Sequence, residues 1–248
     1  MEIDTAINYK QKEFITEVFS NSICIVAPSF FIDLVEATLN GWSFIEKHSD
    51  SIKRDVVVMH KNDSFYIESI VLDQPKVVDD LLDALNEFFL CLSYLVVNKT
   101  KGLKLLHCAS YAEADKNIIT VGPKNSGKSE LILSKAITGK RIYSDDLLLW
   151  STEKGIFISL GLPLRLRRTA ISLIKDKSTK EKFLVGKNIL YSHRNFFDNA
   201  KLGVEFSLDE LKVMDRSFKE KDVPIYKLLS CIEPYLISDR FFSHKKYL

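Results

Sequence analysis

The sequence is poor in the residues that mark specialised architectures. It holds only nine glycines and four cysteines in 248 residues, and no two of the cysteines form a C-x-x-C pair. This scatter excludes a zinc framework of the usual spacing and a disulfide scaffold, and it predicts reduced, mostly buried thiols. The net charge is only +2, from 35 basic and 33 acidic side chains. Such a balance argues against a nucleic-acid partner or a polybasic membrane contact.

Long apolar runs are also absent. The most apolar stretch, FFLCLSYLVV (88–97), is much shorter than the about 20 residues that a membrane span requires. The first residues, MEIDTAINYKQKEF, are polar and carry acids, so they lack the basic and apolar regions of a signal peptide. We therefore expect a cytoplasmic globular protein with a sizeable core, in which residues 88–97 belong to a buried helix.

Local patterns in the first hundred residues predict a small mixed domain. Apolar spacing predicts a helix over 29–40, and the turn KNDS predicts two strands within 54–72. A long helix is expected to open at Pro75 and to end near NKTKG, because proline and early acids suit the first helical turn. We place a domain boundary there, which gives an N-terminal α+β domain (1–102) and an α/β domain (103–248).

The second domain opens with two strand-like runs, 103–112 and 117–122, which are joined by the polar turn EADK and are expected to pair as a hairpin. A helix follows from Ser129 to about Gly139. RIYSDDLLLW (141–150) is expected to be one strand, and GIFISLGLPLRLRR (155–168) is also strand-like.

The stretch NIITVGPKNSGKSELIL (117–133) carries the strongest functional signal. The spacing Gly122-x4-Gly127-Lys128-Ser129 is the phosphate-binding P-loop pattern, and it lies between a predicted strand and a predicted helix, as that pattern requires. Glycines allow a tight turn whose N–H groups point at an anion near a helix N-terminus. We expect Lys128 to contact the β- and γ-phosphates and the Ser129 hydroxyl to ligate Mg²⁺. The loop therefore predicts a nucleoside triphosphate held by Gly122, Pro123, Lys124, Asn125, Ser126, Gly127, Lys128 and Ser129.

Two adjacent acids follow the loop. Asp145 comes sixteen residues after Ser129, one predicted helix and one predicted strand later. We expect this strand to lie beside the P-loop strand, with the acids near its carboxyl end, where ligands bind in open α/β sheets. Phosphoryl transfer needs a carboxylate for the attacking group and acids for the metal, and Asp145 and Asp146 could divide these tasks. A pair of solvated strand-end acids is the alternative.

His107, in LLHCAS, lies fifteen residues before Gly122. In the expected hairpin its side chain would lie several residues from the turn and could reach the cleft. From its residue type alone, a satisfied core histidine is the simpler interpretation.

Together these residues resemble the HPr kinase/phosphorylase family. That family has a histidine in a strand, a P-loop reading GxxGxGKSE fifteen residues later, and an Asp-Asp pair after one helix. The resemblance covers about forty residues, from LHCAS to YSDD (106–146), and includes Glu130 directly after the loop serine. It implies a P-loop core akin to that of phosphoenolpyruvate carboxykinase and an ATP-dependent phosphorylation of serine on a peptide or small protein.

The resemblance also implies roles for single residues. Asp145 matches the general base, His107 matches the histidine of the catalytic region, and Lys128 and Ser129 match the phosphate and Mg²⁺ contacts. Glu130 extends the nucleotide-binding loop. ATP and Mg²⁺ are therefore the expected cofactors.

Two family segments have no counterpart here. The second metal ligand of the family is a glutamate in a segment reading EIRG, whereas this chain reads LGLPLRLRRTAI (160–171), which leaves Asp146 as the candidate metal ligand. The C-terminal signature linked to dephosphorylation is missing from 207–229, so the resemblance extends neither to phosphorylase activity nor to HPr as the substrate.

Arginines take the place of the missing glutamate segment. Alternation puts Arg165 and Arg167 on one face of a strand, where their forked donors would suit phosphate or carboxylate, and we expect Arg165 to stabilise the transferring phosphoryl charge. A solvated sheet face is the simpler interpretation.

The leading hypothesis is thus an ATP-dependent kinase that acts on a serine hydroxyl of a peptide or small protein. A small-molecule P-loop kinase and a non-catalytic nucleotide-sensing module are the alternatives. Residues 1–102 carry no motif; a substrate-docking role for them and a homo-oligomeric state are hypotheses only.

Overall fold

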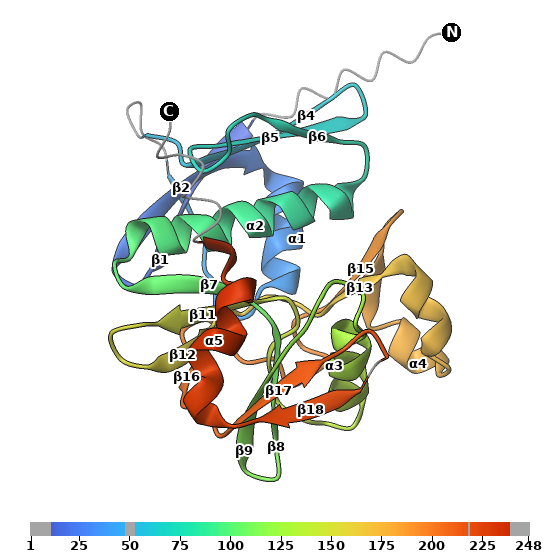
Figure 1. The fold of residues 1–248 in the computed structure, drawn as a ribbon. Helices are drawn as coiled ribbons and strands as arrows, with labels where there is room; N and C mark the ends of the chain where they lie inside the picture. Colours follow the sequence, from blue (N-terminus) through green and yellow to red (C-terminus); the bar gives the residue numbers. More distant parts are fainter. Residues whose placement is uncertain (1–10, 48–52, 218, 239–248) are drawn as a thin grey trace, which may run out of the picture.

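The computed structural model describes residues 11–47, 53–217 and 219–238. Over these ranges the chain is a mixed α/β fold built from four β-sheets and a few helices, drawn in Figure 1. One sheet consists only of N-terminal strands, and the other three are formed by residues after 102. The mixed α/β character predicted from the sequence is therefore confirmed.

The N-terminal sheet has six strands in the order β3-β1-β2-β4-β5-β6. Two of its hairpins turn through pairs of residues with positive φ, Phe19-Ser20 and Asn62-Asp63, a conformation that matches the twist of the flanking strands. The second pair lies in the predicted KNDS turn. The strands are β1 (Gln11–Val18), β2 (Asn21–Pro28), β3 (Ile45–Lys47), β4 (Val56–Lys61), β5 (Ser64–Ser69) and β6 (Lys76–Val78).

Two helices accompany this sheet, α1 (Ser29–Thr38) and the long α2 (Leu81–Lys99). The prediction that the long helix opens at Pro75 is wrong, because residues 76–78 pair with β5 as strand β6. The helix begins after Asp80, whose Oδ1 accepts hydrogen bonds from the N–H groups of Leu82 and Asp83. A capping carboxylate therefore sets the start of the helix, and the proline does not.

Helix α2 lies between the N-terminal sheet and the rest of the molecule (Figure 1). It is long and apolar enough to cross a membrane, but 61% of its most apolar window is buried inside the protein, as expected for a core helix. The largest buried cluster joins α2 and the N-terminal sheet to residues beyond 102, including Leu105, Leu149 and Tyr191. The sheets thus change at the proposed boundary near 102, while the hydrophobic core runs across it.

The P-loop strand belongs to a five-stranded sheet in the order β10-β8-β9-β17-β18. A second sheet, in the order β16-β12-β11-β7, is formed by strands that alternate along the sequence with those of the first sheet. Helix α3 (Lys128–Ile137) packs on β8 and β10. The strands of the two sheets are β7 (Leu103–His107), β8 (Ala109–Glu113), β9 (Lys116–Val121), β10 (Ile142–Ser144), β11 (Leu147–Ser151), β12 (Ile156–Ser159), β16 (Glu205–Phe206), β17 (Glu210–Met214) and β18 (Glu220–Val223).

Two segments that were predicted as single strands each divide between these sheets. The run 103–112 breaks at Cys108, so that β7 pairs with β11 while β8 alone forms the hairpin with β9. The run 141–150 breaks at Asp145-Asp146, which separates β10 from β11. The N–H of Cys108 donates to the carbonyl of Asp146 at 3.0 Å, so the two breaks are joined. Because both segments pass from one sheet to the other at this point, His107 and the two acids lie close together.

The remaining described elements are a small sheet and several short helical segments. A small sheet in the order β13-β15-β14 packs against α2 through β15 and against α3 through β13. Its strands are β13 (Arg165–Arg167), β14 (Phe183–Val185) and β15 (Ile189–Ser192). The helical elements are η1 (Arg168–Leu173), α4 (Lys177–Lys180), η2 (Ile225–Lys227), α5 (Leu228–Ile232) and η3 (Glu233–Tyr235).

Candidate functional site

The P-loop segment has the backbone that its sequence pattern predicts. Strand β9 ends at Val121, the loop turns through Asn125 (φ +66°) and Gly127 (φ +93°), and α3 begins at Lys128. Asparagine tolerates the left-handed region better than most residues, so it can occupy this turn. A Cβ on Gly122 would lie 2.5 Å from the carbonyl oxygen of Met214, which explains why glycine is required there. The loop thus folds tightly at a helix N-terminus.

Lys128 is buried inside this loop. Its Nζ donates to the carbonyl oxygens of Gly122 (2.8 Å) and Pro123 (3.2 Å), and burial lowers its pKa. The Oγ of Ser126 is fully buried without a hydrogen-bond partner in the described residues. A cradle with a central ammonium and an unused hydroxyl suits an anionic ligand.

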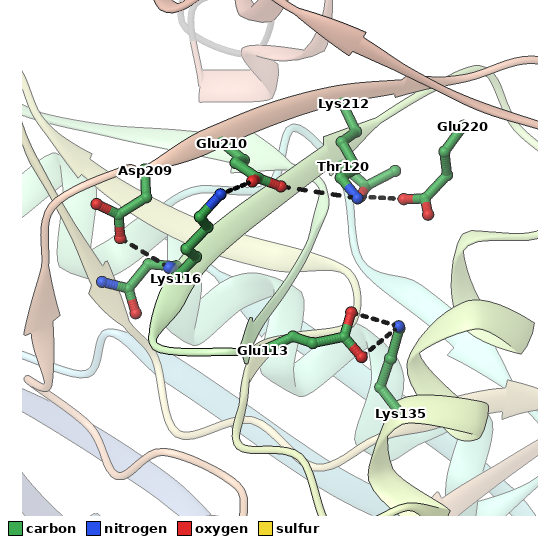
Figure 2. Close-up of polar contacts among 9 residues, drawn as sticks. Glu113, Lys116, Thr120, Lys135, Asp209, Glu210, Lys212 and Glu220 are labelled. Atoms are coloured by element: carbon green, nitrogen blue, oxygen red, sulfur yellow. Dashed lines mark hydrogen bonds and ion pairs between the residues drawn. The ribbon is translucent and has the colours of Figure 1, made fainter.

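A polar network outside the loop holds its two flanks, as Figure 2 shows. Strand β17 runs parallel to β9, and the pair is joined by Lys116–Glu210 (2.6 Å) and by the N–H of Asn117 to Asp209 Oδ2 (2.8 Å). At the other end of β9, Thr120 donates to Glu220 of β18 (2.8 Å).

The same network fixes the helix that follows the loop. Lys135 of α3 contacts both carboxylate oxygens of Glu113 on β8, at 2.7 and 2.8 Å. This ion pair lowers the pKa of Glu113. The strand before the loop and the helix after it are therefore tied to different neighbours, which limits how far the loop can open.

The Asp145-Asp146 pair lies at the sheet edge that also carries the P-loop, but by a different route from the expected one. The prediction that its strand lies beside the P-loop strand is wrong, because β8 lies between β10 and β9. Since β10 and β9 are both antiparallel to β8, they run in the same direction and their carboxyl ends meet at one edge. The acids consequently lie at the same sheet edge as the loop, although β8 separates their strand from the P-loop strand.

The two acids have opposite electrostatic environments. Burial, reinforced by the charge of Asp146, raises the pKa of Asp145 to about 7. Its Oδ2 accepts the N–H of Arg165 (2.9 Å), whereas its buried Oδ1 has no hydrogen-bond partner in the described residues. Burial also disfavours the charge on Asp146, but the hydrogen bond and charge of His107 outweigh it and lower the pKa of Asp146. A carboxyl pair whose pKa values are pushed apart is typical of an acid–base site.

His107 and Arg165 flank Asp146. The His107 Nε2 lies 2.9 Å from Asp146 Oδ1, and the Arg165 Nη1 lies 3.9 Å from Oδ2. The interpretation of His107 as a satisfied core residue does not fit this position, since its side chain is 31% exposed and borders the cleft. Along β13, Arg165 is half-buried, Leu166 is buried and Arg167 is exposed, so the predicted alternation is confirmed.

One cleft of about 800 Å³ gathers these residues. Every site residue predicted from the sequence lines it: His107, Gly122, Pro123, Lys124, Asn125, Ser126, Gly127, Lys128, Ser129, Glu130, Asp145, Asp146 and Arg165. Its volume lies in the range of pockets that bind cofactor-sized ligands, roughly 300–1,000 Å³. The cleft therefore has room for a nucleotide in addition to part of an acceptor.

Sequence reasoning missed the far wall of the cleft. Pro234, Tyr235 and Ile237 line it, because the C-terminal segment returns to β7 through a bridge between Leu106 and Leu236. Thr169 and Ala170, after β13, line it as well. No local pattern marks Pro234, Tyr235 and Ile237, since their place depends on a contact across more than a hundred positions.

A divalent cation in this cleft would need a substrate to supply some of its ligands. Among the described residues no group of three or more His, Cys, Asp and Glu side chains is placed to hold a metal ion. Ser129, Asp145 and Asp146 nevertheless border the same cleft, and Mg²⁺ characteristically takes one or two carboxylates plus substrate phosphates and water. The site thus fits a magnesium ion that arrives with a nucleotide.

The four cysteines are not part of this chemistry. All are free, three are buried, and burial raises the pKa of Cys108 beside the cleft. The chemistry of the site must be argued from the loop, the acid pair and their neighbours.

Neither a scan against models of known protein families nor a search of curated protein sequences finds a match to this chain.

Proposed function

We propose that this protein is an ATP-dependent kinase that transfers the γ-phosphoryl group to a serine hydroxyl of a peptide or small protein. The observation that carries the proposal is the meeting, in one cleft, of a P-loop with a carboxyl pair in which Asp145 is buried, Asp146 is half-buried and the two pKa values are pushed apart. The P-loop supports binding of a triphosphate, and a carboxylate of pKa about 7 supports removal of a proton at neutral pH. The fold expected from the resemblance, a P-loop core akin to that of HPr kinase, belongs to the same proposal.

The proposed reaction assigns one task to each group. The backbone N–H groups of residues 124–129 and the Lys128 ammonium hold the phosphates of ATP. Asp145 accepts the proton of the acceptor hydroxyl through Oδ1, the carboxylate oxygen that has no partner among the described residues. The acceptor oxygen forms a bond to the γ-phosphorus, the bond from that phosphorus to the β–γ bridging oxygen breaks, and ADP leaves.

The neighbours of Asp145 orient this chemistry. The N–H of Arg165 holds the other oxygen of Asp145, and the Arg165 guanidinium lies beside Asp146, where it can also face transferring phosphoryl charge. His107 keeps Asp146 charged, and that charge in turn raises the pKa of Asp145. Ser129 and Asp146 would hold an Mg²⁺ ion that arrives with ATP, and the ion would supply neutralisation of the phosphate charge. Positioning and charge account for most of the rate enhancement in this scheme.

The direct test of the proposal is a titration with Mg²⁺–ATP. We expect the wild-type protein to bind the nucleotide and Lys128→Ala to bind it roughly 100-fold more weakly, since a buried charge contact to phosphate is lost. Lys154→Ala, an exposed lysine outside the cleft and outside the network that holds the loop, is the matched control and should bind as the wild type does. Unchanged affinity in a folded Lys128→Ala variant would overturn the proposal. A cytoplasmic location remains a prediction.

A further inference from the structure

The acids and Arg165 border a second hollow on the side away from the P-loop. This hollow, which we call the α2 pocket, holds about 140 Å³ and is lined by Asp145, Asp146 and Arg165 together with apolar side chains. Phe89 and Leu90 of α2 form one wall of the pocket. The same three residues line the P-loop cleft, so the carboxyl proposed above as the base belongs to the wall between the two hollows.

Two polar atoms in the shared wall have no hydrogen-bond partner within the described residues. They are the Oδ1 of Asp145 and the Nε of Arg165, both buried. Buried polar groups are nearly always hydrogen-bonded, so two such atoms on residues that line the same hollow indicate a place where a ligand is expected. Asn86 adds a fixed polar group at the pocket, because its Oδ1 accepts the Tyr191 hydroxyl at 3.1 Å.

The α2 pocket borders a larger groove. This α2 groove, of about 610 Å³, shares Asn86 and Arg165 with the pocket, and it shares Arg165, Arg167 and Thr169 with the P-loop cleft. It runs between α2 and the sheet β13-β15-β14. A chain segment lying in the groove could therefore direct one side chain toward Asp145.

The charge of the groove favours an acidic occupant. Four of its lining residues are basic and two are acidic: Arg165, Arg167, Arg168, Lys187, Asp83 and Glu87. Lys187 is bound to Asp79 at 2.8 Å, whereas Arg167 is exposed and makes no ion pair with any described residue. Arginine forks bind carboxylates well, and complementary charge selects partners.

We propose that the acceptor reaches Asp145 from the α2 side, as the hydroxyl side chain of an acidic peptide segment that lies in the α2 groove. This inference rests on the proposed kinase function and specifies its substrate class. The pocket has the volume of only four or five water molecules, at about 30 Å³ each, which suits a serine or threonine side chain. The larger groove has room for the main chain on either side.

The test uses a synthetic library of dodecapeptides with one central serine and degenerate flanks that contain no other hydroxyl residue. The full-length protein is incubated with the library and γ-labelled ATP, and the labelled peptides are sequenced. We expect labelling to require the serine and to enrich Asp and Glu in the flanks. Leu90→Phe and Leu162→Phe, two changes of half-buried side chains that fill the pocket, should each lower labelling roughly tenfold or more. Their affinity for Mg²⁺–ATP should equal that of the wild type.

Leu208→Phe is the matched control, since Leu208 is also half-buried but lines none of the three hollows. It should label the library as the wild type does. Strong labelling that the two pocket variants leave unchanged, or flanks enriched in Lys and Arg, would overturn the acceptor route while the kinase proposal stands. A wild type that binds ATP but labels no peptide would overturn both the route and the peptide substrate. A wild type that does not bind ATP would refute the kinase proposal at its first step.

Discussion

The two sides of Asp145 differ in how they are built. The P-loop side consists mainly of one continuous segment, residues 122–130, with its strand and helix. The α2 side is assembled from α2, the stretch before β13, and β15, which are far apart in the sequence. A phosphate cradle needs only consecutive N–H groups, so a short motif can encode it, whereas a pocket for a side chain needs walls from several elements. The comparison predicts that the two sides can be damaged separately.

The largest effect is expected for Asp145→Asn. The variant removes the proposed base while it preserves the size of the side chain, so transfer should fall by about 10²–10⁴, the usual contribution of general acid–base catalysis. Binding of Mg²⁺–ATP should change little. The measurement is labelled-phosphate transfer beside an ATP titration, and normal transfer by the variant would show that Asp145 is not the base.

The same variant tests the burial of Asp145 without any substrate. Because the folded-state pKa of about 7 exceeds the unfolded value, the folded protein holds the extra proton between pH 4 and 7, and the free energy of unfolding falls as pH rises through that window. Asparagine carries no charge, so Asp145→Asn should be more stable than the wild type at pH 8, by up to about 4 kcal/mol. Near pH 4 the two should agree. The measurement is the unfolding free energy of both proteins, from denaturant titrations at pH 4 and pH 8. Equal stability at pH 8 would contradict a raised pKa.

His107→Phe is expected to have an intermediate effect. The variant removes the Nε2 contact to Asp146, so the pKa of Asp146 should rise. As Asp146 loses its charge, it no longer raises the pKa of Asp145, so the acid limb of the pH–rate profile, which follows the proposed base Asp145, should move to lower pH. We expect a loss of transfer of roughly tenfold at neutral pH, which is the value of one hydrogen bond to a charged group. His193→Phe, outside the cleft, is the control. A lower rate with an unmoved pH profile would indicate a purely structural role.

The smallest effect is expected for Thr120→Val, a change in the P-loop strand β9. This change deletes the buried hydrogen bond to Glu220 (Figure 2) and should cost about 1 kcal/mol of unfolding free energy, with ATP affinity within about twofold of the wild type. Thr138→Val, which removes a hydroxyl that bonds only to carbonyls within its own helix, is the comparison in the same denaturation experiment. A large loss of ATP affinity would show that the network also sets the loop conformation.

Much of the fold near the loop could be predicted, and the larger arrangement could not. The P-loop, the helix after it and the alternation of Arg165 and Arg167 follow local patterns, and the structure has them. The breaks at Cys108 and at Asp145-Asp146 were not predicted, because an apolar run looks the same whether it stays in one sheet or passes to another. The start of α2 was misplaced because Pro75 and Asp80 are both good helix-start signals, and the pairing of 76–78 with β5 decided between them.

The sequence by itself determined the tight loop before α3, because the glycine spacing acts through backbone geometry within nine residues. It also placed two acids and a histidine at separations that could serve that loop. Only the tertiary structure decided which acid is buried and which is charged, since pKa depends on surrounding dielectric and on neighbours such as His107. It alone also decided that α2 closes the far side of Asp145, because such a wall arises only when distant elements pack into one core.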